Sequence, residues 1–321
     1  MSSILITGIH GFVGSNLVAT LKEKHTIYGL DIVSPQKEGI ISTYAWEELG
    51  ILPSVDMIIH LAGKAHDTND QLNEQDYFDI NTGLTLQIFD FFLKSSAKRF
   101  IFFSSVKAVA DSVIGEQLTE EVSPNPKTPY GKSKLEAEKY ILNEFEKWKK
   151  KEIACGRINE LKKVYILRPC MIHGPGNKGN LNLLYKLQNK GIPWPLGAFD
   201  NNRSFTSIQN LQFVIQELIE NDIKPDTYQI ADDESLSTNQ LIRLMADSLN
   251  RKAHIWNFSP RMIKLMAITS DKLGLPLNSE RLKKLTESYV VSNQKLKNAL
   301  NIEKMPFTAE EGLKKTFDSF L

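Results

Sequence analysis

The sequence predicts an α/β protein whose main domain is a doubly wound parallel sheet, followed by a smaller C-terminal domain. Short apolar runs rich in β-branched residues alternate with stretches of helical periodicity through the first half of the chain, as in successive βαβ units. After Arg168-Pro169 this alternation gives way to loops rich in glycine and proline, and the pattern is helical from Ser237 onward. A length of 321 residues is more than one domain usually needs.

The first expected strand, Ile4–Thr7, runs directly into a glycine-rich turn. Apolar residues recur at helical spacing after this turn, whose glycines are Gly8, Gly11 and Gly14. Between a strand and a helix, glycines allow a tight turn, a close approach of the backbone to a pyrophosphate and close packing of helix on strand. The helix N-terminus adds unpaired N–H groups that attract phosphates. We interpret the motif as a dinucleotide-binding turn, the alternative being an ordinary turn.

The second expected strand, Thr26–Asp31, ends in an acid. A carboxylate at this position can accept hydrogen bonds from both hydroxyls of an adenosine ribose. It would also repel a 2′-phosphate, and residues 32–34 include no arginine that could bind one. Asp31 therefore favours NAD over NADP, the alternative being a surface acid at a strand end.

The remaining elements of the expected sheet follow in order. Further strands are predicted at Val55–Leu61, Arg99–Phe103, Lys163–Leu167 and Tyr228–Ala231, and helices at Asn81–Leu93 and Tyr130–Trp148. Right-handed crossovers between such strands produce a parallel sheet with its ligands at the carboxyl ends of the strands.

The helix that starts at Tyr130 carries a second chemical signal. Tyr130 and Lys134 are four residues apart, so their side chains share one face of the helix. An ammonium group beside a phenol favours the phenolate and lowers the pKa of the phenol. Such a tyrosine can take up or return a proton while a hydride moves to or from a nicotinamide. Together with the glycine-rich turn, the pair predicts hydride-transfer chemistry.

On these residues the chain resembles the extended short-chain dehydrogenase/reductase family, in its NAD-dependent nucleotide-sugar epimerase/dehydratase branch. The resemblance extends over nearly the whole length. The matching motifs are Thr7-Gly8-x-x-Gly11-Phe12-Val13-Gly14, His60-Leu61-Ala62-Gly63, Asn81-Thr82-Gly83, Phe103-Ser104-Ser105, Pro129-Tyr130-Gly131-Lys132-Ser133-Lys134, Arg168-Pro169 and His173-Gly174-Pro175-Gly176.

The resemblance implies a Rossmann-type NAD-binding domain made of residues 1–170 with about 205–232. It also implies a smaller nucleotide-sugar-binding domain made of residues 171–204 and 233–321. Tyr130 would be the catalytic acid and base, and Lys134 would bind the nicotinamide ribose. Further cofactor contacts would come from Phe12, Val13, Leu61, Ala62, Gly63 and Asn81. Family members pair through the helices that correspond to residues 81–93 and 130–148, so we expect a homodimer.

The chain departs from the family pattern just after Ser105. A serine or threonine that polarises the C4 oxygen of the sugar usually stands one residue after Ser105, where this chain has Val106. Ser105 is the nearest hydroxyl and is our candidate for that catalytic role, the alternative being a purely structural one. Dehydratases carry an acidic pair just beyond this position, where the chain has Lys107 and Ala108. This difference disfavours elimination of water.

Three residues are candidates for binding the nucleotide part of a substrate. Asn180 and the segment Arg203–Phe205 resemble family contacts to uridine diphosphate, and Arg281 is a further candidate. A guanidinium suits a diphosphate because it can donate two parallel hydrogen bonds. Either arginine could instead belong to a surface ion pair.

The predicted function is hydride transfer at C4 of a UDP-linked hexose or N-acetylhexosamine. If the hydride returns to the other face of the same sugar, the enzyme is a 4-epimerase. If a UDP-4-keto-6-deoxy-hexosamine arrives from solution and leaves reduced, it is a 4-reductase. The segments 104–107 and 176–180 favour a role in bacterial polysaccharide biosynthesis for either enzyme. A non-catalytic NAD sensor is the third possibility, which the presence of both Tyr130 and Lys134 disfavours.

Composition narrows the class of protein further. Lys and Arg number 39 against 38 Asp and Glu, and this net charge of +1 argues against a dedicated nucleic-acid or membrane surface. The 2 cysteines and the spacing of the histidines predict neither a disulfide framework nor a metal site. No apolar stretch reaches transmembrane length, and the first strand leaves no room for a signal peptide, so we expect a cytoplasmic protein.

Overall fold

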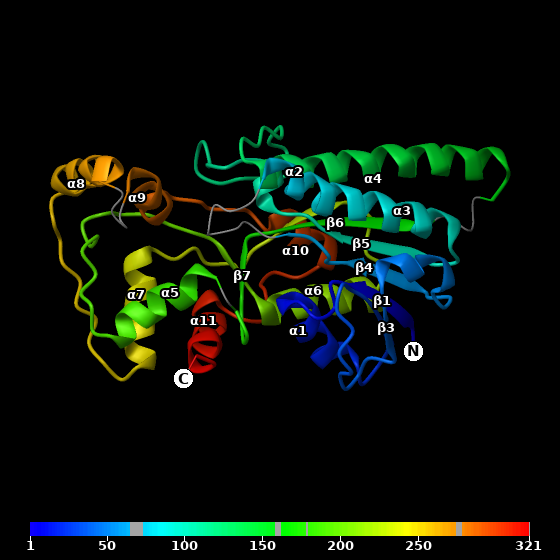
Figure 1. The fold of residues 1–321 in the computed structure, drawn as a ribbon, viewed down its shortest axis with the longest axis horizontal. Coiled ribbons are helices and arrows are strands. Elements are labelled where there is room, and N and C mark those ends of the chain that lie inside the picture. Colours follow the sequence, from blue (N-terminus) through cyan, green and yellow to red (C-terminus); the bar gives the residue numbers. More distant parts are fainter. Residues whose placement is uncertain (65–72, 158–161, 178, 274–277, 321) are drawn as a thin grey trace.

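The computed structural model describes residues 1–64, 73–157, 162–177, 179–273 and 278–320. Seven parallel strands form the main sheet in the order β3-β2-β1-β4-β5-β6-β9 (Figure 1). The strands are β1 (Ser3–Thr7), β2 (Thr26–Leu30), β3 (Ser42–Tyr44), β4 (Met57–His60), β5 (Arg99–Phe103), β6 (Lys163–Pro169) and β9 (Thr227–Ile230). The strand order reverses between β1 and β4, which is the switch point where doubly wound sheets bind ligands. The predicted Rossmann-type fold class is confirmed.

Helices cover both faces of the sheet because consecutive strand residues point to opposite sides. Ile4 and Ile6 of β1 pack against α1 (Phe12–Leu21), α6 (Ile208–Glu220) and α10 (Gln294–Leu300). Leu5 between them faces α3 (Leu84–Lys94) and α4 (Pro129–Ala154) on the other side (Figure 1). The glycine-rich turn, the β4 carboxyl end and the start of α4 therefore meet at one edge.

Two helix starts have local causes that bear on the site. Thr128 caps α4, accepting a hydrogen bond from Gly131 N, and Pro129 occupies the first turn, where its missing N–H is harmless. Before α3 the chain forms α2 (Glu74–Tyr77) and a π-helical turn, η2 (Phe78–Gly83). The predicted helix at Asn81–Leu93 thus begins earlier than expected, and π-turns of this kind occur often at functional sites.

The C-terminal part of the chain packs around a core of its own at one end of the sheet (Figure 1). Its helices are α5 (Asn180–Asn189), α7 (Thr238–Ser248), α8 (Pro260–Leu273), α9 (Ser279–Thr286) and α11 (Ala309–Asp318). A two-stranded parallel sheet, β7 (Met171–His173) with β8 (Phe205–Ser207), joins this part to β6 and α6. Two 3-10 turns, η1 (Trp46–Ile51) and η3 (Val106–Ala108), follow β3 and β5. None of the described helices is long and apolar enough to cross a membrane.

Candidate active site

The glycine-rich turn is too tightly packed for any side chain. Gly8 has φ +67°, and a Cβ there would lie 2.9 Å from the backbone of Ala62. A Cβ on Gly14 would lie 2.5 Å from Ile9 O, so α1 could no longer pack on β1. The N-terminus of α1 consequently opens directly onto the carboxyl end of β1, with its N–H groups free for an anion.

Replacing Gly14 by alanine should weaken NAD binding at least tenfold and lower the free energy of unfolding by about 1–3 kcal/mol, because helix and strand must separate to admit the methyl group. Calorimetric titration with NAD and thermal unfolding measure the two effects. Gly50→Ala is the matched control, since a Cβ there meets nothing within 4 Å. Equal NAD affinity in the two variants would contradict the assignment of this turn.

Asp31 is fixed beside the same turn. Its carboxylate accepts hydrogen bonds from His10 N at 3.0 Å and from Ile32 N at 2.7 Å, which hold it at the carboxyl end of β2. Each oxygen keeps a lone pair, so the carboxylate can also accept from the two hydroxyls of a ribose.

The Asp31→Asn variant should bind NAD about ten- to a hundredfold more weakly, because hydrogen bonds to a charged group are worth about 1.5–3 kcal/mol. Its affinity for NADP should fall less or rise, since the charge that repels the 2′-phosphate is gone. Asp56→Asn provides the control: this carboxylate accepts from Ser3 N at 2.7 Å, at the start of β4 rather than at a carboxyl end. The NAD/NADP preference measured by titration should change in the first variant and not in the second.

The loop after β4 completes the cofactor side of the site. Ala62 N donates to Thr7 Oγ1 at 3.0 Å, and Asn81 of η2 accepts from Lys64 N at 2.7 Å. A Cβ on Gly63 would lie 2.8 Å from Asn81 Oδ1 and 3.1 Å from Lys134 Nζ. The loop therefore passes close to the ammonium group only because residue 63 has no side chain. With the closed turn at Gly8 and Gly14, this arrangement fits an extended dinucleotide.

His60, just before this loop, has a structural role. Its Nδ1 lies 2.6 Å from Thr7 Oγ1 and its Nε2 lies 2.9 Å from Thr85 Oγ1, so both nitrogens have partners. Burial and the nearby Lys134 charge keep the pKa of His60 well below its ordinary value, so the ring is neutral.

Tyr130, Lys134 and Ser105 meet where β5 ends and α4 begins. Lys134 Nζ donates to Phe103 O at 3.0 Å, and the Ser105 hydroxyl is close enough to the phenol of Tyr130 to lower its pKa. Ser105 Oγ already accepts from Lys107 N at 3.1 Å, which leaves its own proton to be donated to the phenol oxygen. The tyrosine ring is held against Tyr77 with 6.2 Å between ring centres. Val106 points into an apolar cluster and offers no hydroxyl.

The ionisation of this group differs from the sequence-based expectation in one respect. Burial raises the pKa of Tyr130 above its ordinary value, and the Ser105 hydrogen bond opposes that rise. Burial also lowers the pKa of Lys134 to about 8, while Glu138 acts in the opposite direction. Lys134 is not among the groups that shift the pKa of this phenol, so the lowering by Lys134 that the sequence predicted is not found in the protein alone.

A buried ion pair behind Lys134 was missed by the sequence analysis. Glu138 is 2% exposed and accepts from Arg168 Nε at 2.9 Å, from Arg168 Nη2 at 2.5 Å and from the Ser104 hydroxyl. It lies one helical turn after Lys134, so this ion pair ties α4 to β6 directly beside Tyr130 and Lys134. Glu138 continues the four-residue spacing of Tyr130 and Lys134, but nothing local in the sequence indicates Arg168 as its partner.

The comparisons with known proteins agree with this geometry. The profile of the NAD dependent epimerase/dehydratase family matches residues 4–231. The chain belongs to this family. A UDP-glucose 4-epimerase of Vibrio cholerae is 31% identical over 99% of this chain and 95% of its own length. A GDP-6-deoxy-D-mannose reductase of Pseudomonas aeruginosa is 26% identical over 76% of this chain and 79% of its own length.

Solved structures confirm the fold of the epimerase/dehydratase family along the whole chain. The structure of a UDP-N-acetylglucosamine 4-epimerase from Bacillus cereus superposes with a TM-score of 0.73. It covers 99% of this chain and 98% of its own, at 17% sequence identity. The protein is therefore an enzyme of an NAD-dependent family, as the sequence predicted, and its cofactor is NAD.

Among the predicted substrate residues, Arg203 lies near the segment that follows Ser105. Its backbone pairs with Tyr289, whose hydroxyl donates to Ala110 O at 2.7 Å and to Val106 O at 3.3 Å. Lys107 Nζ lies 4.0 Å from the centre of the Tyr289 ring, so Tyr289 joins Arg203 to the segment after Ser105. Arg203 is partly buried, and its guanidinium donates to Lys284 O.

The structure shows less about the other two predicted substrate residues, Asn180 and Arg281. Asn180 is the first residue of α5, and its side chain lies outside the described part of the structure. Arg281 is exposed near the start of α9, where its backbone N donates to Asn278. Among the described residues no group of three or more His, Cys, Asp or Glu side chains could hold a metal ion.

Proposed function

We propose that the protein is a UDP-hexose or UDP-N-acetylhexosamine 4-epimerase. The observation that carries the proposal is the meeting of Tyr130, Ser105 and Lys134 at the strand ends beside a glycine-rich turn that fits NAD. The substrate class is supported by the identity shared with the Vibrio cholerae UDP-glucose 4-epimerase over almost the whole chain. We further propose that residues 1–170 with about 205–232 bind NAD, and that residues 171–204 and 233–321 bind the nucleotide sugar.

In this proposal the residues of the chain move one proton at the C4 oxygen of the sugar. Tyr130 would remove the proton of the C4 hydroxyl and later return it, with the positive charges of Lys134 and bound NAD favouring the phenolate that burial alone disfavours. Ser105 donates a hydrogen bond that stabilises the negative charge on whichever of the two oxygens carries it. Lys134 supplies a positive charge that is present at neutral pH, since the pKa of this group is about 8. The chemistry that bound NAD would supply is acceptance and return of the C4 hydride.

Arg203 is the proposed anchor for the diphosphate, with Asn180 and Arg281 as further contacts. A partly buried guanidinium that donates to a backbone carbonyl can exchange that partner for a diphosphate oxygen, which is a stronger acceptor. The contact through Tyr289 would then connect occupation of the nucleotide site to the loop that carries Ser105. We also propose that the enzyme is a cytoplasmic homodimer paired through α3 and α4, acting in polysaccharide biosynthesis.

A 4-reductase is the second candidate, and one observation favours it. Val106 is buried among apolar residues, so the hydroxyl usual in the epimerases of this family is missing and Ser105 alone replaces it. The identity with a GDP-6-deoxy-D-mannose reductase supports this reading. In a reductase Tyr130 would only donate its proton to the 4-keto oxygen, so the base function would not be required.

The experiment that tests the proposal uses the purified protein without added cofactor. NMR follows separate incubations with UDP-N-acetylglucosamine and UDP-glucose, and a 4-epimerase should form the galacto-configured sugar from one of them. A protein that is folded and carries NAD but leaves both spectra unchanged would contradict the epimerase. Conversion of a UDP-4-keto-6-deoxy-hexosamine in the presence of NADH would then establish the reductase.

A further inference from the structure

An exposed apolar surface lies on α8, at the end of the molecule remote from the main sheet (Figure 1). Met262, Leu265 and Met266 are three and four residues apart, so they line one side of this helix, and Leu265 is 66% exposed. A different side of α8 packs on the protein, because Ile263 and Ala267 are buried against Leu282 of α9. The exposed apolar side of α8 is therefore separate from the side that packs against α9.

Two aromatic side chains are also exposed, on the segment that leads into α8. Trp256 and Phe258 are 51% and 38% exposed, and their ring centres are 5.7 Å apart. The backbone beneath them is fixed, because Trp256 N donates to Trp194 O at 2.8 Å and Gly197 N donates to Trp256 O at 3.0 Å. The rings thus project from a paired segment rather than from a free loop. Exposed aromatic rings of this kind are enriched where a protein meets a lipid interface.

The charged side chains of residues 251–270 all carry a positive charge. Residues 251–270 contain no Asp or Glu and four exposed cations, Arg251, Lys252, Arg261 and Lys264. The first acid after it is Asp271, a carboxylate that accepts hydrogen bonds from the backbone N of Ser279 at 2.9 Å and from the Ser279 hydroxyl. The net charge of +1 for the whole chain therefore conceals a strongly basic surface at this end.

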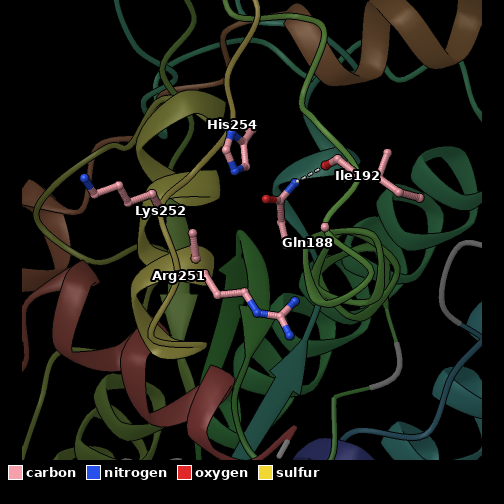
Figure 2. A pocket seen from close by; sticks show the side chains of 7 residues that line it. Gln188, Ile192, Arg251, Lys252 and His254 are labelled. Atoms are coloured by element: carbon pink, nitrogen blue, oxygen red, sulfur yellow. Dashed lines mark hydrogen bonds between the residues drawn. The ribbon is translucent and has the colours of Figure 1, made fainter.

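A cavity of about 320 Å³ opens beside the first two of these cations. Figure 2 shows Arg251, Lys252 and His254 on one side of it and Gln188 and Ile192 on the other. Arg251 Nη1 donates to Asn189 O at 2.6 Å, which holds the guanidinium at the α5 side. The lining residues include none of the catalytic or cofactor residues, so this cavity belongs to the basic end of the molecule and not to the active site.

We propose that the exposed residues of 251–270, hereafter the basic-apolar surface, dock the enzyme on an anionic phospholipid bilayer. Apolar side chains flanked by cations are the combination that binds a negatively charged interface, with the apolar groups at acyl-chain depth and the cations at the phosphates. A second copy of the chain is a poorer occupant, because a symmetric contact would bring four cations against four. This docking departs from the composition-based expectation of no membrane partner and does not depend on the identity of the sugar.

Vesicle sedimentation of the full-length protein tests the proposal. The protein should sediment with phosphatidylcholine vesicles containing phosphatidylglycerol, and about tenfold less with phosphatidylcholine alone or in high salt. Leu265→Ser/Met266→Ser should weaken the binding about tenfold, since two exposed apolar side chains no longer enter the interface. Arg261→Gln/Lys264→Gln should do the same by removing two charges. These side chains are exposed, so we expect folding and NAD binding to be unchanged.

Ile41→Ser/Ile51→Ser is the matched control, because these side chains are 65% and 71% exposed on another part of the surface. Its vesicle binding should equal that of the wild type. No sedimentation of the wild type with anionic vesicles would overturn the proposal, and so would equal binding by all variants. Self-association in analytical ultracentrifugation that disappears in Leu265→Ser/Met266→Ser would also overturn it, in favour of a contact between copies.

Discussion

Replacing Tyr130 by phenylalanine should lower kcat about a thousandfold and leave NAD binding nearly unchanged. The phenol is the group placed to move the C4 proton, and a positioned acid–base group contributes about 10²- to 10⁴-fold to a rate. The ring itself contacts Tyr77 with 6.2 Å between ring centres, a contact that phenylalanine keeps. Turnover by NMR and NAD affinity by calorimetry measure the two quantities.

Tyr140→Phe is the control for this variant, because Tyr140 lies on the same helix and its hydroxyl donates to Asp90 at 2.6 Å, away from the site. Its turnover should remain within about twofold of the wild type, because no acid–base group is lost. A Tyr130→Phe enzyme with full activity would exclude the phenol from the reaction. Loss of NAD together with activity would instead indicate that the hydroxyl supports the fold of the cofactor site.

Replacing Glu138 by methionine should lower the free energy of unfolding by about 3–5 kcal/mol, the cost of leaving Arg168 buried without its partner. Both side chains are almost fully buried, at 9% and 2% exposure for Arg168 and Glu138, so solvent can compensate little. Chemical denaturation followed by circular dichroism measures the change. Replacing an exposed ion pair, as in Glu280→Met next to Lys284, should change the free energy by less than about 1 kcal/mol.

The double variant Glu138→Met/Arg168→Met separates the ion pair from the packing around it. With both charges removed, its unfolding free energy should return to within about 2 kcal/mol of the wild type, the remainder including the unpaired Ser104 hydroxyl. If the double variant were as unstable as the single one, the loss would arise from packing, and the ion pair would not be the cause.

The strands of the fold could be predicted because they are buried on both faces. β5 coincides with the expected Arg99–Phe103, and β1 and β6 differ from expectation by one or two residues at their ends. The missed strands are β3, β7 and β8, which have three residues each. A run of three residues is too short for either periodicity to be visible, and β3 is a half-exposed edge strand without a continuous apolar pattern.

Within the site, the residues with local signals were predicted and those defined by long-range contacts were not. Gly8 and Gly14 belong to one short motif, and Tyr130 and Lys134 belong to another, so the sequence alone locates these four residues. The pairing of Glu138 with Arg168 spans 30 residues and depends on α4 and β6 being side by side. The π-turn η2 also resists prediction, because its extra residue per turn has no sequence signature of its own.

The central claim is that Tyr130 moves the proton while the sugar C4 is oxidised, and stopped-flow absorbance of the bound cofactor tests it most directly. On mixing NAD-loaded wild-type protein with UDP-glucose or UDP-N-acetylglucosamine, we expect the absorbance of reduced nicotinamide to rise with one of the sugars. The Tyr130→Phe variant, equally loaded, should show that rise about a thousandfold more slowly. Equal rates in the two proteins, or no reduction in the wild type with either sugar, would contradict the account.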